Sequence, residues 1–468
     1  MYFKSRQGRL EPSRSAGACA AWNLEPITVM KLYLVSLGCV RNLVDSEVML
    51  GMLAKAGWST TQDPEKADVI IVNTCSFIEP AIKESIDTIL ELAKLKQRNN
   101  CKKLIVTGCL PERFREEIVS ALPEVDFFLG TGDFNEIVHA AAGGLTDISR
   151  CLLPDPNLAP LQPQNVPRIY SSPHIAYLRV AEGCDKRCTY CIIPKLRGKY
   201  RSRPFEDIIA EARFLILSGV KELILVAQDS TCYGKDLSPS IDLCMLIESI
   251  ANISQNVWIR ILYGHPQSIT GSFVKTVATH SNICSYFDIP IQHVSRSVLK
   301  RMGRKYSRDD LCRLIEKIRS LDPDAAIRTT VIVGFPGETD KDFHQLLKFI
   351  QEIRFDHLGA FIYSDSEDLL SHRLSGHVPK KAARKRYDLL MSSQAKISLE
   401  NNSKHIGKVV KVLVEEKRKN NIFSGRSAFQ APEVDGITYI NANQLQVGCF
   451  AHAKITNALE YDLIGEVV

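Results

Sequence analysis

The chain has 468 residues, which is too long for one ordinary domain and predicts two or three. Hydrophobic residues make up 45% of the chain and charged residues 24%, a balance typical of globular proteins, and no apolar run reaches the length of a membrane-spanning helix. The net charge of +6 is small for this length, so it permits a ribonucleoprotein partner but does not require one.

Residues 1–30 are polar and small and show no period, so we expect a disordered extension there. They lack the apolar stretch of a signal peptide, which predicts a cytoplasmic, reducing location without membrane association. In that compartment, fourteen cysteines indicate metal or redox chemistry together with core filling, and not a framework of disulfides.

From residue 31 the chain alternates short apolar runs with helical stretches. Residues 31–39, 68–75 and 102–109 are expected to be strands that end in loops, and residues 45–56 and 80–95 are expected to be helices. Alternating strands and helices imply parallel pairing. Residues 31–150 therefore predict an N-terminal α/β domain built on a doubly wound parallel sheet.

A cysteine lies at the end of each of these three predicted strands. Because the carboxyl ends of parallel strands share one edge of the sheet, we expect Cys39, Cys75 and Cys109 to converge there. Any one of them alone would more often be a buried strand-end cysteine. Three cysteines in matched positions favour a shared iron-sulfur cluster with one iron left open.

The middle of the chain begins with a proline-rich stretch, residues 151–173, which is predicted to be an extended and fairly stiff linker. Six strand-helix units are too few to close an eight-fold barrel and favour an open, partial barrel, whose reactive face lies at the carboxyl ends of its strands. Within residues 174–400 the six predicted strands are residues 174–181, 220–227, 257–262, 284–289, 327–333 and 357–363.

Directly after the first of these strands, Cys184, Cys188 and Cys191 form a C-x3-C-x2-C pattern. Three thiolates on one short loop suit three corners of an iron-sulfur cube, whereas a structural zinc site usually has four protein ligands. Three inert core cysteines among charged neighbours are the less favoured alternative. An iron without a protein thiolate can bind S-adenosylmethionine, and an electron can then cleave a carbon-sulfur bond to give a deoxyadenosyl radical.

Polar residues after the later strands are expected at the same face. Gln228 and Asp229 are placed to contact the methionine or ribose part of the cofactor, and Gly334 would let the backbone approach the adenosine. A lone histidine is about as often a satisfied structural residue as a ligand contact. With that alternative open, the candidate substrate contacts are Tyr263, His265, Gln292 and His293.

Towards the end of the chain, residues 378–399 predict a helix whose first turns carry a run of Lys and Arg, a pattern that is more often a solvated face than a nucleic-acid contact. Residues 401–468 contain five short predicted strands, which favour a small antiparallel barrel. This segment holds eight Lys or Arg against seven Asp or Glu, a net charge of about +1. RNA-binding barrels are usually more basic.

The C-x3-C-x2-C pattern, with the aromatic Tyr190 just before its last cysteine, resembles the radical S-adenosylmethionine superfamily. The order of three strand-end cysteines, this pattern and a TRAM-like barrel, over residues 31–468, resembles the methylthiotransferases of that superfamily. Three stretches look like the subfamily that modifies an aspartate of small-subunit ribosomal protein S-twelve: residues 39–47 (CVRNLVDSE), 286–293 (YFDIPIQH), and 425–427 with 430–436 (GRS and QAPEVDG).

This resemblance implies an enzyme that methylthiolates the β-carbon of that aspartate, in the free protein or in the small ribosomal subunit. It implies two 4Fe-4S clusters, two S-adenosylmethionine molecules and an electron donor, with Tyr190 near the cofactor. The cluster on Cys184, Cys188 and Cys191 would produce the radical that removes hydrogen from a C–H bond which no side-chain base can deprotonate. The cluster on the strand-end cysteines would hold the sulfur that is delivered.

Two alternatives stay open. One is a tRNA adenosine 2-methylthiotransferase, which would use the barrel to bind RNA. The other, from a different class, is a non-catalytic iron-sulfur protein that assists ribosome assembly. Nucleic-acid contact is expected to be secondary in the favoured reading, and the oligomeric state is not predicted.

Overall fold

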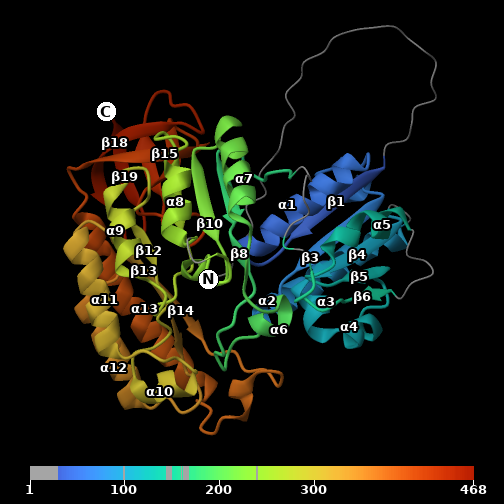
Figure 1. The fold of residues 1–468 in the computed structure, drawn as a ribbon, viewed down its shortest axis with the longest axis horizontal. Coiled ribbons are helices and arrows are strands. Elements are labelled where there is room, and N and C mark those ends of the chain that lie inside the picture. Colours follow the sequence, from blue (N-terminus) through green and yellow to red (C-terminus); the bar gives the residue numbers. More distant parts are fainter. Residues whose placement is uncertain (1–29, 99–100, 144–149, 160, 162–167, 239–240) are drawn as a thin grey trace. The chain divides into compact units, whose positions relative to one another are not determined.

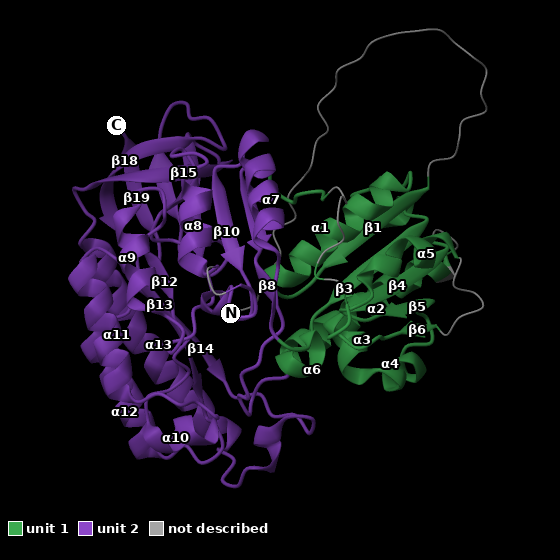
Figure 2. Ribbon diagram, in the orientation of Figure 1, with its two compact units in different colours: residues 1–172, 193–199 green, residues 173–192, 200–468 purple. Residues whose placement is uncertain are grey.

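The computed structural model describes residues 30–98, 101–143, 150–159, 161, 168–238 and 241–468 (Figure 1). Apart from Met30, the extension expected at residues 1–30 lies outside the described residues. The chain divides into two compact units (Figure 2): residues 1–172 together with 193–199, and residues 173–192 together with 200–468. The short segment 193–199 therefore belongs to the first unit, although the segments that precede and follow it in the sequence belong to the second.

The first unit is built on a six-stranded sheet in which all neighbours are parallel, which confirms the doubly wound parallel sheet. The outer strands β2, β5 and β6 are only two or three residues long, too short for a sequence period to predict them. β6 also occupies the start of the stretch expected to be a linker. The strand order is β2 (Ser59–Thr60), β1 (Lys31–Ser36), β3 (Val69–Thr74), β4 (Lys103–Gly108), β5 (Phe127–Leu129) and β6 (Cys151–Leu152).

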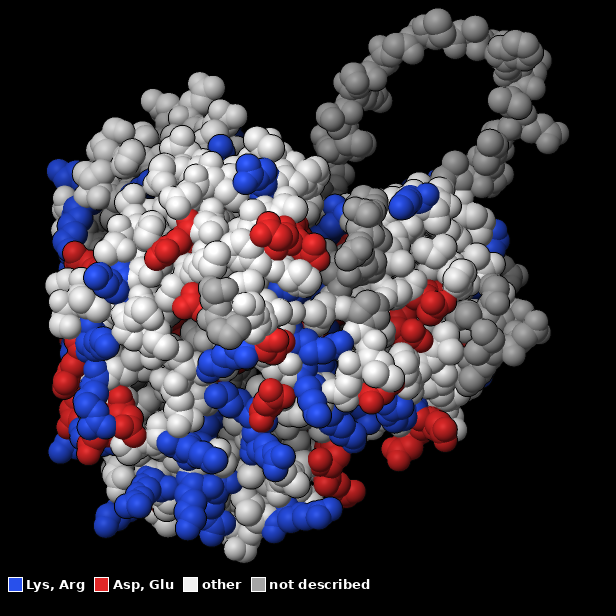
Figure 3. Space-filling model, in the orientation of Figure 1, with Lys and Arg blue, Asp and Glu red and all other residues white. Residues whose placement is uncertain are grey.

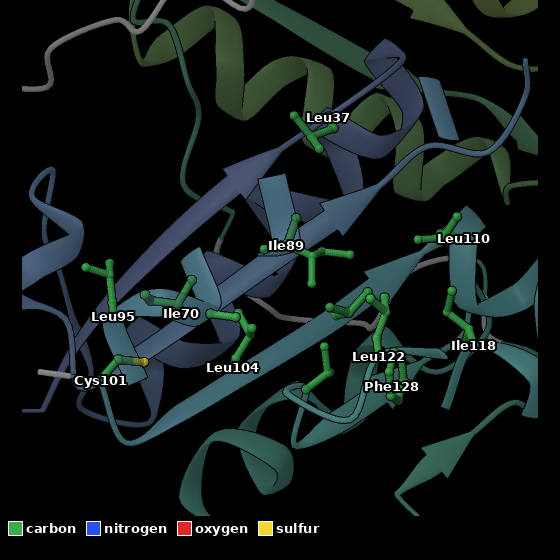
Figure 4. Packing of buried hydrophobic residues seen from close by; sticks show 14 of the residues in the cluster. Leu37, Ile70, Ile89, Leu95, Cys101, Leu104, Leu110, Ile118, Leu122 and Phe128 are labelled. Carbon is green, nitrogen blue, oxygen red and sulfur yellow. The ribbon is translucent and has the colours of Figure 1, made fainter. Parts of the chain in front are cut away.

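Side chains of this sheet alternate between two hydrophobic cores. Ile70 of β3 points into a core shared with α2 (Glu79–Gln97) and α4 (Glu116–Ala121), part of which Figure 4 shows. The next residue, Ile71, points into the opposite core with α1 (Val40–Lys55) and α5 (Ile137–Ala142). All six residues of β3 are buried, as expected for a central parallel strand that is covered on both faces.

The second unit contains six parallel strands in two three-stranded sheets. A parallel bridge between Ile259 and Ile283 continues one sheet towards the other, so the open, partial barrel is confirmed. The sheets have the orders β7-β10-β11 and β12-β13-β14, with β7 Ile175–Arg179, β10 Glu222–Val226, β11 Trp258–Ile261, β12 Tyr286–Asp288, β13 Ala326–Val333 and β14 His357–Ile362.

Helices connect these strands, and two of them begin at capping boxes. Ser307 and Asp310 cap α11, and Thr339 and Asp342 cap α12, so the polar residues of the sequence fix where each helix starts. The helices are α7 (Phe205–Leu217), α8 (Leu243–Ala251), α9 (Gly271–Thr279), α10 (Arg296–Arg301), α11 (Arg308–Leu321), α12 (Asp340–Ile353) and α13 (Lys380–Ser403).

The expected C-terminal barrel is present and closed, in the order β15-β16-β17-β19-β18. One pair, β17 with β19, is parallel, because strand directions cannot alternate all the way around a ring of five. The strands are β15 (Val409–Lys417), β16 (Ile422–Ser427), β17 (Thr438–Asn441), β18 (Phe450–Ala458) and β19 (Leu463–Val467).

This barrel contacts the amino ends of the strands of the partial barrel. Tyr286, the first residue of β12, donates from its hydroxyl to Oδ2 of Asp435 at 2.6 Å. His357, the first residue of β14, lies with Nε2 2.7 Å from the carbonyl oxygen of Phe429. These contacts of the C-terminal barrel are therefore at the amino ends of the strands and not at their carboxyl ends.

Among the described residues, no helix combines the length and the apolar character that crossing a membrane requires. Charged side chains are spread over the surface, but Lys and Arg gather around α10, where Arg296 and Lys300 are exposed (Figure 3). This positive region is local, in agreement with the small net charge of the chain.

Candidate functional site

The three strand-end cysteines of the first unit follow three adjacent strands. Cys39 immediately precedes α1, Cys75 follows β3, and Cys109 begins α3 (Cys109–Phe114) directly after β4. Along the chain, β2 is added to the sheet on one side of β1, and β3 and the later strands are added on its other side. The direction in which strands are added therefore reverses between β1 and β3. In doubly wound sheets, ligands bind outside the carboxyl ends of the strands at this switch point.

Two glycines allow the backbone to bring these cysteines together. Gly38 has a φ of +90°, and a Cβ added there would lie 2.5 Å from the Cβ of Cys75. Gly108 has a φ of +95°, and its added Cβ would lie 2.3 Å from Oδ1 of Asn73 and 2.7 Å from the carbonyl oxygen of Thr74. Both the left-handed conformation and the close approach therefore require glycine.

Buried hydroxyl groups hold the backbone of two of the cysteines. The backbone N–H of Cys75 donates to Oγ of Ser85 at 3.1 Å, and that hydroxyl donates to the carbonyl oxygen of Cys75 at 2.9 Å. Oγ of Ser76 donates to the carbonyl oxygen of Cys109 at 2.8 Å. These bonds fix the backbone of the two loops and do not involve the thiols.

The three thiols and nearby arginines shift one another's pKa values. Burial, together with the thiols of Cys109 and Cys39, raises the pKa of Cys75 to about 12. Burial also raises the pKa of Cys109. Burial acts in the same direction on Cys39, but Arg41 and Arg197 outweigh it and lower the pKa of that thiol. Ligation to iron would deprotonate all three, because a metal binds the thiolate form.

The C-x3-C-x2-C cysteines lie on the loop that follows β8 (Ala181–Glu182), a short strand paired antiparallel with β9 (Arg201–Ser202). Thr189 anchors this loop to the end of α10. Its N–H donates to the carbonyl oxygen of Met302 at 3.1 Å, and its Oγ1 donates to the carbonyl oxygen of Arg301 at 2.8 Å. Burial raises the pKa of the Cys184 thiol to about 11.

Tyr190 fixes the same loop from within. Its hydroxyl accepts hydrogen bonds from Nε of Arg304 at 3.0 Å and from Nη2 at 2.6 Å, and its ring meets the ring of Phe335 edge-on with centroids 6.3 Å apart. These contacts support the loop. A contact between Tyr190 and a cofactor stays a prediction.

Gly334, expected near the adenosine, has a second reason to be glycine. Its φ is +74°, and a Cβ added there would lie 2.5 Å from the Cβ of Ala383 in α13. Its N–H donates to the carboxylate of Glu338. The packing of α13 therefore already requires a small residue here, and the approach of a cofactor stays a prediction.

Gln228 and Asp229 follow β10, at the carboxyl face of the partial barrel. Nε2 of Gln228 donates to the carboxylate of Glu182, which directly precedes the cysteine loop. Asp229 is buried, accepts a hydrogen bond from Oγ1 of Thr231 at 2.6 Å, and lies 3.8 Å from Nζ of Lys186 within the loop. Both predicted residues are thus linked to the cysteine loop.

The two candidate histidines are buried and neutral. Burial lowers the pKa of each to about 3. Nδ1 of His265 accepts from the N–H of Gln267 at 3.2 Å, and Nδ1 of His293 accepts from the N–H of Ser295 at 2.9 Å, which places each ring proton on Nε2. Within the described residues, Nε2 of His293 has no hydrogen-bond partner.

Tyr263 and Gln292 have backbone conformations that no sequence period predicts. They follow β11 and β12 and have φ values of +65° and +63°. The N–H of Tyr263 donates to Oδ2 of Asp288 at 3.0 Å, and that of Gln292 donates to the carbonyl oxygen of Thr330 at 2.8 Å. Left-handed backbone at such residues costs energy and is concentrated at functional sites.

The iron-sulfur clusters expected at the two cysteine sets stay predictions. In the part of the chain that the structure describes, no three His, Cys, Asp or Glu side chains are grouped tightly enough to hold one ion. A four-iron cluster spreads its thiolate ligands over different iron atoms, so its cysteines surround it and do not crowd one point. Each set has three thiols on connected, hydrogen-bonded loops.

Several polar residues near the two cysteine sets escape prediction from the sequence. Glu182 and Lys186 lie beside and within the C-x3-C-x2-C motif. Their closeness to the cysteines in sequence could have indicated that they lie at this site. Arg197, in contrast, is 88 residues from Cys109, whose sulfur it approaches to 3.9 Å, so only the fold reveals the contact. The residues concerned are Asn42, Asp45 and Arg197 in the first unit and Glu182, Lys186 and Arg304 in the second.

Three family models match successive parts of the chain. The model of UPF0004, described as an uncharacterized protein family, matches residues 31–130. The radical SAM superfamily model matches residues 178–350, and the TRAM domain model matches residues 406–468. The three matches correspond to the parallel sheet, the partial barrel and the closed C-terminal barrel.

Curated relatives from three bacteria match almost the whole chain, and all three carry the name ribosomal protein uS12 methylthiotransferase RimO. The relative from Desulfosudis oleivorans is 52% identical over 438 residues, covering 93% of this chain and 100% of the relative. The relative from Clostridioides difficile is 48% identical, with 94% and 99% covered, and that from Geotalea uraniireducens is 47% identical, with 94% and 98% covered.

Solved structures of radical S-adenosylmethionine enzymes share the fold. The methyltransferase TsrM from Kitasatospora setae aligns with a TM-score of 0.53 at 13% identity, covering 71% of this chain and 73% of that one. The cobalamin-dependent enzyme OxsB aligns with a TM-score of 0.51 at 14% identity, covering 79% and 56%. At these identities the likeness concerns the fold alone.

Proposed function

The chain belongs to the ribosomal protein uS12 methylthiotransferase family, and from that premise we propose that it attaches a methylthio group to the β-carbon of an aspartate in ribosomal protein uS12. The observation that carries this proposal is 52% identity over the full length of a relative with that name. The same match includes the parallel sheet, the partial barrel and the C-terminal barrel. The chain is a radical S-adenosylmethionine enzyme, a class that uses a 4Fe-4S cluster together with S-adenosylmethionine.

We infer two cluster sites in this chain. Cys184, Cys188 and Cys191 would hold one cluster, and the strand-end cysteines Cys39, Cys75 and Cys109 the other. With S-adenosylmethionine bound, the first site would supply radical chemistry, and the second would hold the sulfur that is transferred. A radical is needed because no side chain of ordinary basicity removes a proton from the β-carbon of aspartate.

The residues around the loop cysteines position this chemistry. Tyr190 and Thr189 hold the loop by the hydrogen bonds to Arg304 and to the end of α10. Glu182, Gln228 and the pair of Asp229 with Lys186 place amide, carboxylate and ammonium groups beside the loop. Such groups match the amino, carboxylate and ribose hydroxyl groups of S-adenosylmethionine, so we assign the cofactor to them.

Substrate contacts are proposed at the remaining strand ends. Tyr263 and Gln292 have left-handed backbone after β11 and β12, and His265, two residues after Tyr263, has a neutral ring. A neutral imidazole can donate one hydrogen bond to a carboxylate without becoming charged. We therefore place the substrate aspartate near these residues, and His293, whose ring accepts from the backbone of Ser295 as that of His265 does from Gln267, stays the fourth proposed contact.

The tRNA-modifying alternative is less well supported. The barrel that would bind RNA carries a net charge of about +1. One of its arginines, Arg426, is buried and paired with Glu222, so it is not presented to an RNA backbone. An anionic ribosomal surface could instead meet the Lys and Arg side chains around α10 (Figure 3).

The test follows the methyl group. Anaerobically reconstituted protein, a reductant and S-adenosylmethionine with a labelled methyl group are incubated with small ribosomal subunits, with isolated uS12 and, separately, with bulk tRNA. We expect the label on one aspartate of uS12, with the added mass of a methylthio group. Label on adenosine of tRNA would instead establish the alternative substrate, and S-adenosylmethionine left uncleaved in every incubation would favour a non-catalytic role.

A further inference from the structure

Arg197 is the last residue of the short helix α6 (Ile193–Arg197), which follows the loop cysteines in sequence but belongs to the first unit. Its side chain is only 4% exposed. Nη1 donates to Oδ2 of Asp45 at 2.7 Å, and Nη2 donates to Oδ1 of Asn42 at 2.7 Å. Two buried acceptors on α1 therefore fix the plane of this guanidinium.

The same guanidinium reaches the strand-end cysteines. Nη2 lies 3.9 Å from Sγ of Cys109. The carboxylate of Asp45 is bound at the other terminal nitrogen, Nη1. The nitrogen that approaches the sulfur is therefore not the one that pairs with the carboxylate.

Asn42 connects this arginine to the sheet edge. Its Nδ2 donates to the carbonyl oxygens of Leu37 and Thr74, at 3.0 and 2.8 Å, and these residues lie just before Cys39 and Cys75. Its Oδ1 is thereby turned towards Arg197 and lies 3.8 Å from Sγ of Cys109. One buried amide therefore sets the position of the guanidinium relative to all three cysteine-bearing loops.

A structural ion pair would need only Asp45. The additional bond to Asn42 and the approach to Cys109 place a permanent cation where thiolates and the cluster they hold would add negative charge. Hydrogen bonds to cluster sulfurs and nearby charge set cluster potentials, and a buried cation stabilises the more negative, reduced state. An arginine stays charged even when buried among cysteines.

We propose that Arg197 is a positioning residue for the strand-end cysteine site, where its fixed guanidinium donates towards Cys109 and raises the reduction potential of the group that the three cysteines hold. This inference rests on the proposed second cluster. It assigns the residues just after the C-x3-C-x2-C loop to the other cysteine set, so residues 184–197 contribute to both sites.

The test isolates the strand-end site in the full-length chain. Cys184, Cys188 and Cys191 are all changed to Ala, and the protein is reconstituted with iron and sulfide under anaerobic conditions. Iron content, the visible spectrum and the midpoint of a dithionite titration followed by electron paramagnetic resonance are then measured. The same measurements are made after adding Arg197→Gln, Arg197→Lys or Lys199→Met, the last being a matched control because Lys199 is an exposed cation in the same segment.

We expect Arg197→Gln to shift the ratio of reduced to oxidised cluster at least tenfold towards the oxidised form, which for one electron is a midpoint lower by about 59 mV. Arg197→Lys keeps the charge and should stay closer to the parent than Arg197→Gln, and Lys199→Met should match the parent. Loss of iron from Arg197→Gln, with iron retained in Arg197→Lys, would also support the proposal.

Equal midpoints for Arg197→Gln and Arg197→Lys would overturn it, and so would loss of iron from both variants, since the role would then be purely structural. A parent chain that binds no iron after the three loop cysteines are removed would be a different failure. That result would contradict the second cluster itself, and with it the proposed division between the two cysteine sets.

Discussion

Gly108 and Gly57 of the first unit have nearly the same backbone conformation and very different surroundings. Their φ values are +95° and +91°, but an added Cβ at Gly108 meets Asn73 and the backbone of Thr74, whereas at Gly57 nothing lies within 4 Å. Substituting Gly57 therefore tests the energetic cost of the left-handed conformation alone. Substituting Gly108 tests that cost together with the cost of crowding beside Cys109.

We expect Gly57→Ala to cost about 1 kcal/mol, the usual penalty for an L-residue with positive φ. Gly108→Ala should cost more, because the added carbon must displace the end of β3, and it should also lower the iron bound at the strand-end cysteines. Thermal unfolding and iron content measure the two effects. Equal melting temperatures and equal iron content in the two variants would show that the cysteine site tolerates movement there.

His293 makes stability depend on pH. The folded protein keeps its imidazole neutral down to a pKa of about 3, because burial disfavours the charged form, whereas in an unfolded chain the group has its ordinary pKa of about 6.5. Between these values the unfolded chain binds a proton that the folded chain does not. The contribution is fully present above pH of about 6.5 and is lost progressively as the pH falls.

His293→Asn should therefore flatten the fall in melting temperature between pH of about 7 and 5, even if the variant melts at a lower temperature throughout. Asparagine offers an acceptor for the N–H of Ser295 but does not titrate. The exposed His344→Asn is the matched control and should keep the parental slope. An unchanged slope in His293→Asn would assign the acid sensitivity to other groups.

At the scale of elements, the C-terminal barrel is fastened to the partial barrel by a buried charge network. Glu222, at the start of β10, contacts Nε of Arg260 at 2.7 Å and pairs with Arg426 of β16. Burial opposes the charge of Glu222, but the two arginines outweigh it and lower its pKa. The network lies at the amino ends of the strands, so it joins the two barrels away from the cysteine loop.

Glu222→Gln should destabilise the second unit by about 3–5 kcal/mol, because it removes the carboxylate that the buried guanidinium groups of Arg260 and Arg426 share, although Arg426 keeps its ion pair with Glu415. The change should also expose the C-terminal barrel to limited proteolysis. Glu416→Gln, on the exposed part of β15, is the control and should cost less than about 1 kcal/mol. A Glu222→Gln protein with the parental melting temperature would mean that apolar packing alone fastens the barrel.

At the scale of the whole molecule, most elements are predictable because their signals are local. Each strand of the partial barrel is a short apolar run bounded by helical sequence, and the three longest strands of the first sheet end in matched cysteines. Strands β2, β5 and β6 are too short to carry a period. The parallel pairing of β17 with β19 follows from ring closure, which no local pattern encodes.

The same distinction separates the predicted and the missed site residues. Cysteine spacing is visible in a single stretch, and the convergence of Cys39, Cys75 and Cys109 follows from a parallel sheet. The contact of Arg197 with Cys109 depends on where a helix from another part of the chain is placed, and the positive φ values of Tyr263 and Gln292 depend on neighbouring strands. Such features come from tertiary structure and have no sequence signature.

The two cysteine sets are proposed to have separate tasks, and one measurement tests this division most directly. Deoxyadenosine and methylthio-aspartate in uS12 are quantified side by side for Cys188→Ala, for Cys75→Ala and for Cys312→Ala as a control outside both sets. We expect neither product from Cys188→Ala, deoxyadenosine without methylthio-aspartate from Cys75→Ala, and both products from the control. Deoxyadenosine formed at the parental rate by Cys188→Ala, or methylthio-aspartate formed by Cys75→Ala, would contradict the division.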